Sequence, residues 1–414
     1  MLTYQKKFLE KLINSYNKKE IKDKSYPLLE NAFTTEDILK GIEVILSKKI
    51  TMSDITKEFE YEFSKYIGSK YALMVNSGSS ANLLAAFALI NPKKKNHLKR
   101  NDMFLIPAVC WSTSLWPFVQ AGLRPIFSDV NINNFCLDEN KISNNILNKI
   151  RLIVTIHVLG NSPNIDLLSN LSKKKNIFLV EDTCESLGSR YNQKYLGTFG
   201  NFGTYSFYYS HQITSGEGGM IICKNKEDYE LLHTLRAHGW DRGLKNNSNN
   251  SFNFINSGFN LRPLDLTAAI GLSQFKRLKQ MMEVRDNNRK LIINKITNHK
   301  KYKNQFEFFN STKNLKPSWF GLPLLLHKDF KQKKNFFLKY LTSKKIENRP
   351  IISGNFLNQP SIKLFKLNKE KNKSNFPVAQ DIDERGFFIG LPTREISNSK
   401  LDYLVNSLLN FNGF

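Results

Sequence analysis

Three short segments of the chain carry residue types that could bind a phosphate group, hold a charged ring and move a proton. The first is NSGSSAN at 76–82, a run of small residues between an apolar segment and the start of a helical pattern. Helix N-termini bind phosphate because they present free N–H groups and the positive end of the helix dipole. Gly78 would let the backbone approach a ligand closely, and Ser79 would add a hydroxyl donor. Taken alone, the segment fits an ordinary serine N-cap equally well.

The second segment is EDTCES at 181–186, which directly follows the apolar run at 177–180. A carboxylate at the carboxyl end of a parallel strand points into the crevice where α/β proteins bind ligands. Asp182 could therefore pair with a protonated ring nitrogen. For this segment in isolation, a helix N-cap is the more common role of such an aspartate.

The third segment is SFYYSHQITSGEGG at 206–219, in which His211 lies among small, aromatic and hydroxyl residues. An unperturbed histidine has a pKa of about 6.5, which suits proton transfer near neutrality. A single histidine is more often a structural residue. The three segments in this order are more informative than each one singly.

The elements around these segments predict an α/β fold. Apolar strand candidates alternate with helical stretches, which favours a mostly parallel sheet with helices on both faces; the candidates span 71–77, 103–108, 124–130, 152–160 and 177–183. Two further strands, at 203–210 and 218–225, have little sequence between them and predict a β-ribbon.

The pattern changes after residue 264, where a long and kinked helix is predicted to about residue 296. Shorter strands and helices follow, at 305–309, 319–326, 329–343 and 398–410. We therefore expect an N-terminal helical segment (1–30), a large α/β domain (31–275) and a small α+β domain (276–414).

Composition narrows the classes of function. The chain has 414 residues and a net charge of +25, but its lysines occur in short bursts without a zinc-finger or RNP-type motif. A solvated basic surface is favoured over nucleic-acid binding. No apolar run is long enough to span a membrane, and the first residues lack the apolar core of a secretory signal, so we expect a cytoplasmic protein without a membrane partner. The four cysteines form no CxxC pair, so neither a metal site nor a disulfide framework is expected.

Taken together, these motifs resemble those of a known family. The matching segments are NSGSSAN, IPAVCWSTSLWPFVQAGLRPIFSDVN (106–131), VEDTCESLGSRY (180–191), GTFGNFGTYSFYYSHQITSGEGG (197–219), RAHGWDRG (236–243) and GFNLRPLDLTAAIGLSQ (258–274). Over almost its whole length the chain resembles the vitamin B6-dependent sugar aminotransferases of fold type I, the DegT/DnrJ/EryC1/StrS family of deoxysugar and lipopolysaccharide biosynthesis. The resemblance implies a seven-stranded sheet between helices, a small C-terminal α+β domain and a homodimer that shares its active sites.

One departure from the family pattern decides the expected reaction. Other members carry a lysine, which binds pyridoxal phosphate covalently, where this sequence has His211. The chain therefore resembles the dehydratase branch, which removes the C3 hydroxyl of a nucleotide-linked 4-keto-6-deoxyhexose. One type in this branch acts on CDP-sugars with an iron–sulfur cluster, and the other acts on GDP-4-keto-6-deoxymannose without one. Only Cys223 lies between His211 and Asn260, and such a cluster needs four thiolates, so the cluster-free type is favoured.

The resemblance implies which residues hold the phosphate of the cofactor. The backbone of Gly78 and Ser79 is expected to bind it with the hydroxyl of Ser206. Asn260 is expected to reach the phosphate of the other subunit's cofactor.

The resemblance also implies roles around the cofactor's ring. Trp111 is expected to stack on the pyridine ring, Asp182 to pair with its nitrogen, and Glu185 to lie near its phenolic oxygen, where other members often have glutamine. With His211 in place of lysine, the working form would be pyridoxamine phosphate, bound without a covalent link. His211 would then act as the base that removes a proton from the cofactor's C4′ carbon, and glutamate would restore the amine form.

Substrate contacts are less clearly implied. RAHGWDRG and ENRPIISGNFLNQPS (347–361) resemble segments that line the sugar-nucleotide pocket in this branch. The candidates for diphosphate or carboxylate contacts are Arg236, His238, Arg262 and Arg349, because arginine binds such groups bidentately. A structural or surface role is equally open for each, and the sequence does not separate GDP from CDP.

Two other interpretations stay open at the level of the sequence. One is a sugar aminotransferase that has lost its lysine, or the related CDP-sugar 3-dehydrase. The other is a non-catalytic regulatory or nucleic-acid-binding relative, which would be expected to have lost Asp182, Trp111 and Ser206, although all three are present.

Overall fold

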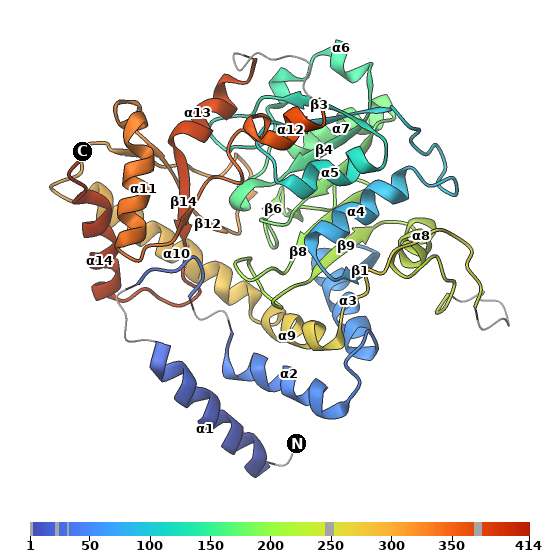
Figure 1. Cartoon of the computed structure of the whole chain (residues 1–414), viewed down its shortest axis with the longest axis horizontal. Helices are drawn as coiled ribbons and strands as arrows, with labels where there is room; N and C mark the ends of the chain where they lie inside the picture. The colour runs from blue at the N-terminus through green and yellow to red at the C-terminus, as the bar shows by residue number, and fades with distance from the viewer. Residues whose placement is uncertain (1–2, 21–24, 31–32, 245–251, 368–374) are drawn as a thin grey trace.

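A computed structural model describes residues 3–20, 25–30, 33–244, 252–367 and 375–414 (Figure 1). Its largest element is a seven-stranded sheet with the order β1-β9-β8-β5-β4-β2-β3. The strands are β1 (Tyr71–Val75), β2 (Met103–Pro107), β3 (Arg124–Ser128), β4 (Ile150–Ile156), β5 (Phe178–Asp182), β8 (Phe202–Ser206) and β9 (Gly219–Cys223). β9 runs opposite to the other strands of this sheet, which confirms the predicted mostly parallel sheet and the predicted ribbon of β8 and β9.

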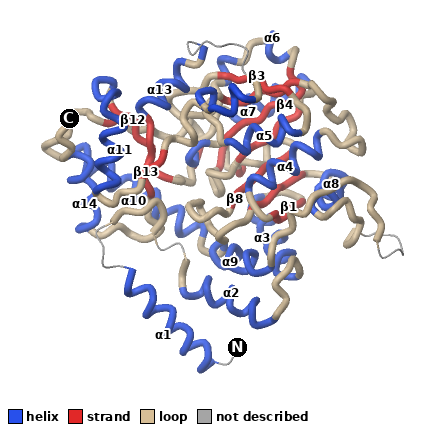
Figure 2. The backbone as a smooth tube through the Cα atoms, in the orientation of Figure 1, coloured by secondary structure: helices blue, strands red, loops and turns tan. Residues whose placement is uncertain are grey.

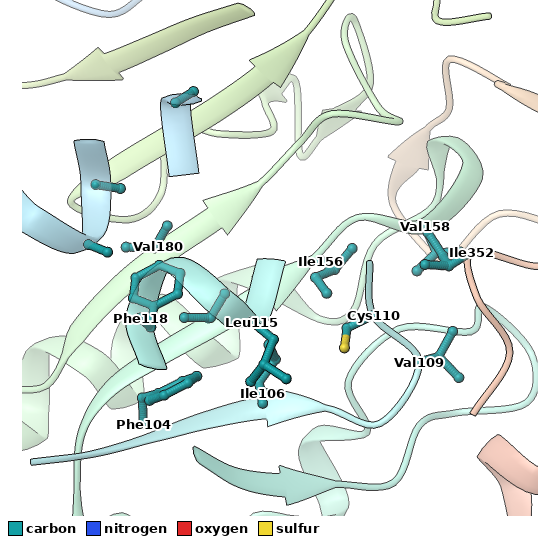
Figure 3. Packing of buried hydrophobic residues seen from close by; sticks show 14 of the residues in the cluster. Phe104, Ile106, Val109, Cys110, Leu115, Phe118, Ile156, Val158, Val180 and Ile352 are labelled. Carbon is teal, nitrogen blue, oxygen red and sulfur yellow. The ribbon is translucent and has the colours of Figure 1, made fainter. Parts of the chain in front are cut away.

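Most strand residues are apolar and buried, as expected for a sheet whose two faces are both covered by helices. On one face, Leu73 and Val75 of β1 pack in the same core as α4 (Gly78–Leu89), α5 (Ser112–Gln120) and α8 (Lys226–Arg236). Figure 3 shows part of this core, where Phe104 and Ile106 of β2 lie close to Leu115 and Phe118 of α5.

On the other face, the alternate residues of the same strands meet a different set of helices. Met74 of β1 and Met220 of β9 pack with α3 (Asp54–Ile67) and α9 (Asp265–Phe275). Further along this face, Leu105 of β2 packs with Leu168 of α7 (Ile165–Lys175) and with Leu147 of the short helix α6 (Asn144–Leu147).

A second, four-stranded antiparallel sheet has the order β10-β12-β14-β13 (Figure 2). It consists of β10 (Phe306–Glu307), β12 (Gly321–Leu326), β14 (Gly386–Gly390) and β13 (Asn348–Arg349). The helices of this region are α10 (Leu278–Thr297), α11 (Lys334–Ser343), α12 (Pro360–Leu364), α13 (Pro377–Arg385) and α14 (Asn398–Leu409). The predicted boundary at 275/276 between the large and small domains stays a prediction, and it falls between the two sheets.

Two connections join the small sheet to the rest of the chain. A three-stranded sheet combines β6 (Arg190–Tyr191) and β7 (Lys194–Tyr195) with β11 (Leu315–Lys316). Tyr26, from the N-terminal region, is buried in the core of the small sheet, and its hydroxyl donates a hydrogen bond to the carbonyl of Gly390 over 3.1 Å. The small domain therefore includes residues from the beginning of the chain.

The predicted long helix at 264–296 is two helices, α9 and α10, separated at Lys276 and Arg277. At the N-terminus, α1 (Thr3–Glu20) lies near α2 (Thr35–Ser47) and leaves Tyr4 and Phe8 exposed (Figure 1). In the part of the chain that the structure describes, no helix is both long and apolar enough to cross a membrane.

Candidate active site

The N-termini of two helices meet beyond the edge of the large sheet where its parallel strands end. β1 leads into α4, and Ser77 caps that helix by accepting a hydrogen bond from the backbone N–H of Ser80 over 3.1 Å. The hydroxyls of Ser79 in α4 and Thr113 in α5 lie 2.8 Å apart, so the two helix ends are joined. Because the N-terminal end of each helix dipole is positive, the region between the two helix N-termini is suited to binding an anion.

Gly78 and Ser206 lie against each other in this region. A Cβ atom on Gly78 would be 2.5 Å from the Cβ and 3.0 Å from the Oγ of Ser206, so only glycine fits. Ser206 is the last residue of β8, and its hydroxyl accepts a long hydrogen bond from the N–H of Tyr208 (3.3 Å). The structure thus brings together Gly78, Ser79 and Ser206, which the sequence predicts as phosphate ligands, in what we call the anion cradle.

Asp182 ends β5 and is 5% exposed. Its Oδ2 atom accepts hydrogen bonds from Nδ2 of Asn82 (2.8 Å) and from the hydroxyl of Ser114 (2.7 Å). Its Oδ1 atom accepts one from the N–H of Cys184 (3.2 Å). These three donors fix the orientation of the carboxylate. Asn82 and Ser114 were not predicted as site residues, although they lie in the segments 76–82 and 106–131.

Trp111 is the N-cap residue of α5, and 56% of its surface is exposed. Its indole is not packed into the core, in contrast to most large aromatic side chains of the sheet. The exposed ring is thus available to stack on a planar ligand, as the resemblance implies.

Glu185 is a carboxyl group with an unusually high pKa. Burial, with a smaller contribution from the negative charge of Asp182, raises the pKa to about 8, while the N–H of Leu159 acts in the opposite direction. That N–H donates a hydrogen bond to Oε2 of Glu185 over 2.9 Å. At neutral pH the group is therefore mostly protonated, and a protonated carboxyl can donate one hydrogen bond to a ligand oxygen.

His211 follows β8, and its ring meets the ring of Phe320 edge-on at 5.1 Å between centroids. The ring of Tyr208 lies edge-on at 6.0 Å, and the Nδ1 atom of His211 is buried without a hydrogen-bond partner. Burial and the positive charge of Arg285 together lower the pKa of His211 to about 3, while the backbone of Tyr208 acts in the opposite direction. The imidazole is thus neutral, and one ring nitrogen is free to accept a proton.

Glu181 and His157 form a hydrogen-bonded pair that is fully buried next to Asp182. Glu181, which precedes Asp182, accepts hydrogen bonds from Nε2 of His157 (3.0 Å) and from the N–H groups of Gly197 and Phe199. Burial alone would raise the pKa of Glu181, but the bonds from His157 and from backbone N–H groups outweigh it and keep that pKa below its usual value. This pair was not predicted, because Glu181 and His157 are 24 residues apart in the chain and meet only in the fold.

The four predicted substrate contacts separate into two groups. Arg236 is buried, and its Nη1 atom donates hydrogen bonds to Oε1 of Glu60 (2.7 Å) and to the carbonyl of Met74 (2.8 Å). The prediction that Arg236 binds substrate is therefore corrected, because its guanidinium is committed to an internal ion pair.

The other three candidates are exposed. The backbone N–H of His238 donates to the carbonyl of Phe259 (2.7 Å), and Nε of Arg262 donates to Oδ1 of Asn260 (3.0 Å). His238, Asn260 and Arg262 thus lie on neighbouring stretches of exposed chain. Arg349 is exposed on β13 of the small sheet.

The fold and the site together define a class, that of the fold type I aminotransferase-like proteins. A model of the DegT/DnrJ/EryC1/StrS aminotransferase family matches residues 32–409. The chain belongs to this family.

Relatives within this family are similar over nearly the whole chain. GDP-4-keto-6-deoxy-D-mannose 3-dehydratase of Escherichia coli O55:H7 is 38% identical over 394 residues, which is 92% of this chain and 98% of the relative. A crystal structure of a mutant GDP-4-keto-6-deoxymannose-3-dehydratase with bound GDP-perosamine is 36% identical, with a TM-score of 0.84 over 93% of this chain and all of the other. A structure of that enzyme with a trapped PLP-glutamate geminal diamine is 35% identical, with a TM-score of 0.82 and the same coverage of both chains.

Proposed function

We propose that the protein is a vitamin B6-dependent 3-dehydratase that removes the C3 hydroxyl of a nucleotide-linked 4-keto-6-deoxyhexose. The substrate we favour is GDP-4-keto-6-deoxymannose, because dehydratases named for that substrate are similar over 88% to 93% of this chain. The observation that carries the proposal is His211, a neutral base where the family's aminotransferases have a lysine. The product belongs to the 3,6-dideoxysugars used in lipopolysaccharide biosynthesis.

The residues of the site fit a pyridoxal or pyridoxamine phosphate cofactor. The anion cradle of Gly78, Ser79 and Ser206 would hold its phosphate, because a Cβ on Gly78 would fill the space. Asp182 would keep the ring nitrogen protonated, and Trp111 would cover the ring. When bound, the cofactor supplies an amine that condenses with the C4 ketone and a ring that accepts electrons.

Two side chains of the site would then act on protons. His211, neutral because of its lowered pKa, would take the proton from the cofactor's C4′ carbon as the C3 hydroxyl leaves. General-base help of this kind is worth about 10²–10⁴-fold in rate. Glu185, protonated at neutral pH, would donate a hydrogen bond to the phenolic oxygen.

Glutamate would be the reductant of the complete cycle. The overall reaction converts the 4-ketosugar and glutamate into the 3-deoxy-4-ketosugar, 2-oxoglutarate and ammonia. It balances without net water, because the C3 hydroxyl leaves as one water and the release of ammonia by hydrolysis consumes one. A relative's structure with a trapped PLP-glutamate adduct supports this choice of donor.

The deciding experiment measures ammonia and 2-oxoglutarate after the purified protein is mixed with pyridoxal phosphate, glutamate and GDP-4-keto-6-deoxymannose. We expect both products in equal amounts, and none with His211→Asn. A parallel reaction with the corresponding CDP-sugar tests the nucleotide. Formation of 2-oxoglutarate with an aminated sugar and no ammonia would show an aminotransferase instead. Borohydride treatment should leave no lysine labelled by the cofactor.

We further propose that the active enzyme is a cytoplasmic homodimer and that Asn260 reaches the partner's cofactor phosphate. Asn260 is exposed and held by Arg262, so its side chain is accessible to a second copy. Light scattering measures the mass of the particle in solution, which should be twice that of the 47.9 kDa chain. Mixing His211→Asn chains with Asn260→Ala chains should restore some activity in mixed dimers, and no recovery would contradict a shared site.

A further inference from the structure

Arg285 of α10 is a buried cation directly behind His211. Its side chain is 1% exposed, and its Nη2 atom donates a hydrogen bond to the backbone carbonyl of His211 over 3.3 Å. Its Nε atom is buried without a partner. Within the described ranges, no carboxylate forms an ion pair with this guanidinium, and burial lowers the pKa of Arg285 to about 10. The group therefore stays charged at neutral pH without a counter-charge.

The position of Arg285 is fixed by the rest of its helix. One turn further along α10, the side-chain amide of Asn288 donates hydrogen bonds to the carbonyls of Pro392 (3.0 Å) and Arg394 (2.7 Å). The guanidinium of Arg289 lies 4.3 Å from the centre of the Trp319 ring. These contacts anchor α10 on the small domain, so Arg285 is held against His211 by a rigid element.

An unpaired charge in this position needs a reason, since burying one costs several kcal/mol. The groups that face His211 are the aromatic rings of Tyr208 and Phe320 and the guanidinium of Arg285. The positive charge of Arg285 disfavours a second positive charge on the imidazole, and the low dielectric constant of the buried surroundings strengthens this effect.

We propose that Arg285 is a positioning residue that pins the backbone of His211 and keeps its imidazole in the neutral, proton-accepting form. The backbone of His211 is held on both sides, because its own N–H donates to the carbonyl of Tyr208 (3.0 Å) while its carbonyl accepts from Arg285. A base must be unprotonated before it can accept a proton. The link to catalysis rests on the proposed function, whereas the effect on the protonation of His211 does not.

The test follows the protonation of His211 by NMR on protein labelled in its histidine rings. The chain has only seven histidines, and His211→Asn identifies the signal. In the wild type we expect the midpoint of the His211 titration to lie clearly below the ordinary value of about 6.5. Arg285→Met should raise that midpoint by about one pH unit or more, while Arg285→Lys, which keeps the charge, should raise it less. A wild-type midpoint at or above the ordinary value would overturn the proposal even if Arg285→Met failed to fold.

Arg289→Met is the matched control, because Arg289 is a buried arginine on the same helix that contacts Trp319 and the carbonyl of Phe309 rather than His211. It should leave the His211 titration unchanged. An equal rise in the Arg289→Met variant would overturn the specific role of Arg285.

Enzyme kinetics test the link to catalysis separately. If the protein is a dehydratase, Arg285→Met should move the acid limb of the kcat profile to higher pH and leave KM for the sugar nearly unchanged. A loss of kcat by the same factor at every pH would show a merely structural role. If the wild type produces no ammonia, the proposed function fails, and the NMR titration still decides the role of Arg285.

Discussion

Replacing Gly78 by alanine tests the anion cradle most directly. The new Cβ would lie 2.5 Å from the Cβ of Ser206 and 3.0 Å from the sulfur of Cys184. Carbon atoms in contact prefer separations of about 3.5–4.0 Å, so about 1 Å of overlap has to be relieved. Because Ser206 ends a fully buried strand, we expect its side chain to rotate or shift away from the cradle.

The magnitude follows from two separate costs. Overpacking of this kind destabilises a protein by about 1–3 kcal/mol, which should appear in the free energy of unfolding of the cofactor-free protein. A displaced Ser206 hydroxyl would also lose a hydrogen bond to a charged phosphate, worth about 1.5–3 kcal/mol. The affinity for pyridoxamine phosphate should therefore fall about tenfold to about 150-fold.

Calorimetry during a titration of the cofactor-free protein with pyridoxamine phosphate measures the affinity. Urea unfolding of the same protein measures the free energy of unfolding. Gly41→Ala is the matched control, because Gly41 lies in α2 and its added Cβ would meet only the mobile side-chain ends of Leu266 and Ile270. That variant should keep its affinity and gain up to about 1 kcal/mol in stability from helix propensity. A folded Gly78→Ala protein that binds pyridoxamine phosphate within about twofold of the wild type would refute the cradle as the phosphate site.

Three further predictions concern other parts of the site. Arg236→Met should lower the free energy of unfolding by about 3–5 kcal/mol in urea experiments, because the carboxylate of Glu60 then stays buried without its ion-pair partner. If the variant has normal stability but binds substrate weakly, Arg236 is a substrate ligand after all. The raised pKa of Glu185, about 8, means that the folded protein keeps a proton that the unfolded chain releases, so stability should fall as pH rises from 4.5 to about 8. Glu185→Gln should reduce this slope in unfolding experiments at several pH values, and identical slopes would contradict the assignment. Trp111→Ala should weaken cofactor binding about two- to tenfold, because an exposed ring that stacks on a ligand contributes about 0.5–1.5 kcal/mol beyond its buried area. Trp111→Phe, which keeps a ring, should weaken binding less. If calorimetry gives the same affinity for both variants and the wild type, Trp111 does not stack on the cofactor.

The central sheet could be predicted from the sequence because its signal is local. Each strand is a short apolar run that is buried on both faces, and each run is bounded by polar or small residues. The ribbon of β8 and β9 could be predicted for the same reason, whereas the single kinked helix predicted at 264–296 is two helices, α9 and α10. Gly78 and Asp182 could be proposed as ligands because they directly follow such strands.

Other features depend on residues far apart in the chain and gave no local signal. From the segment RAHGWDRG alone, Arg236 is a candidate to bind the substrate. Its ion-pair partner Glu60 is 176 residues away in the chain and becomes apparent only in the fold. Arg285 lies in an ordinary polar stretch of a helix, and its burial behind His211 follows from the packing of α10. The helices α2 and α3 and the strand β14 were also missed, since short amphipathic or apolar stretches acquire their structure mainly from the partners they pack against.

The position of Tyr26 has a consequence for how the protein is made. This residue leaves the ribosome long before the strands that bury it, because β12 and β14 lie near the other end of the chain. The core of the small domain thus closes only after synthesis is nearly complete, and a nascent chain that already contains His211 still lacks α10 and Arg285. A stalled or truncated product would carry the anion cradle without the helix that holds the base in place, so function depends on the last third of the chain although most of the chemistry is encoded before it.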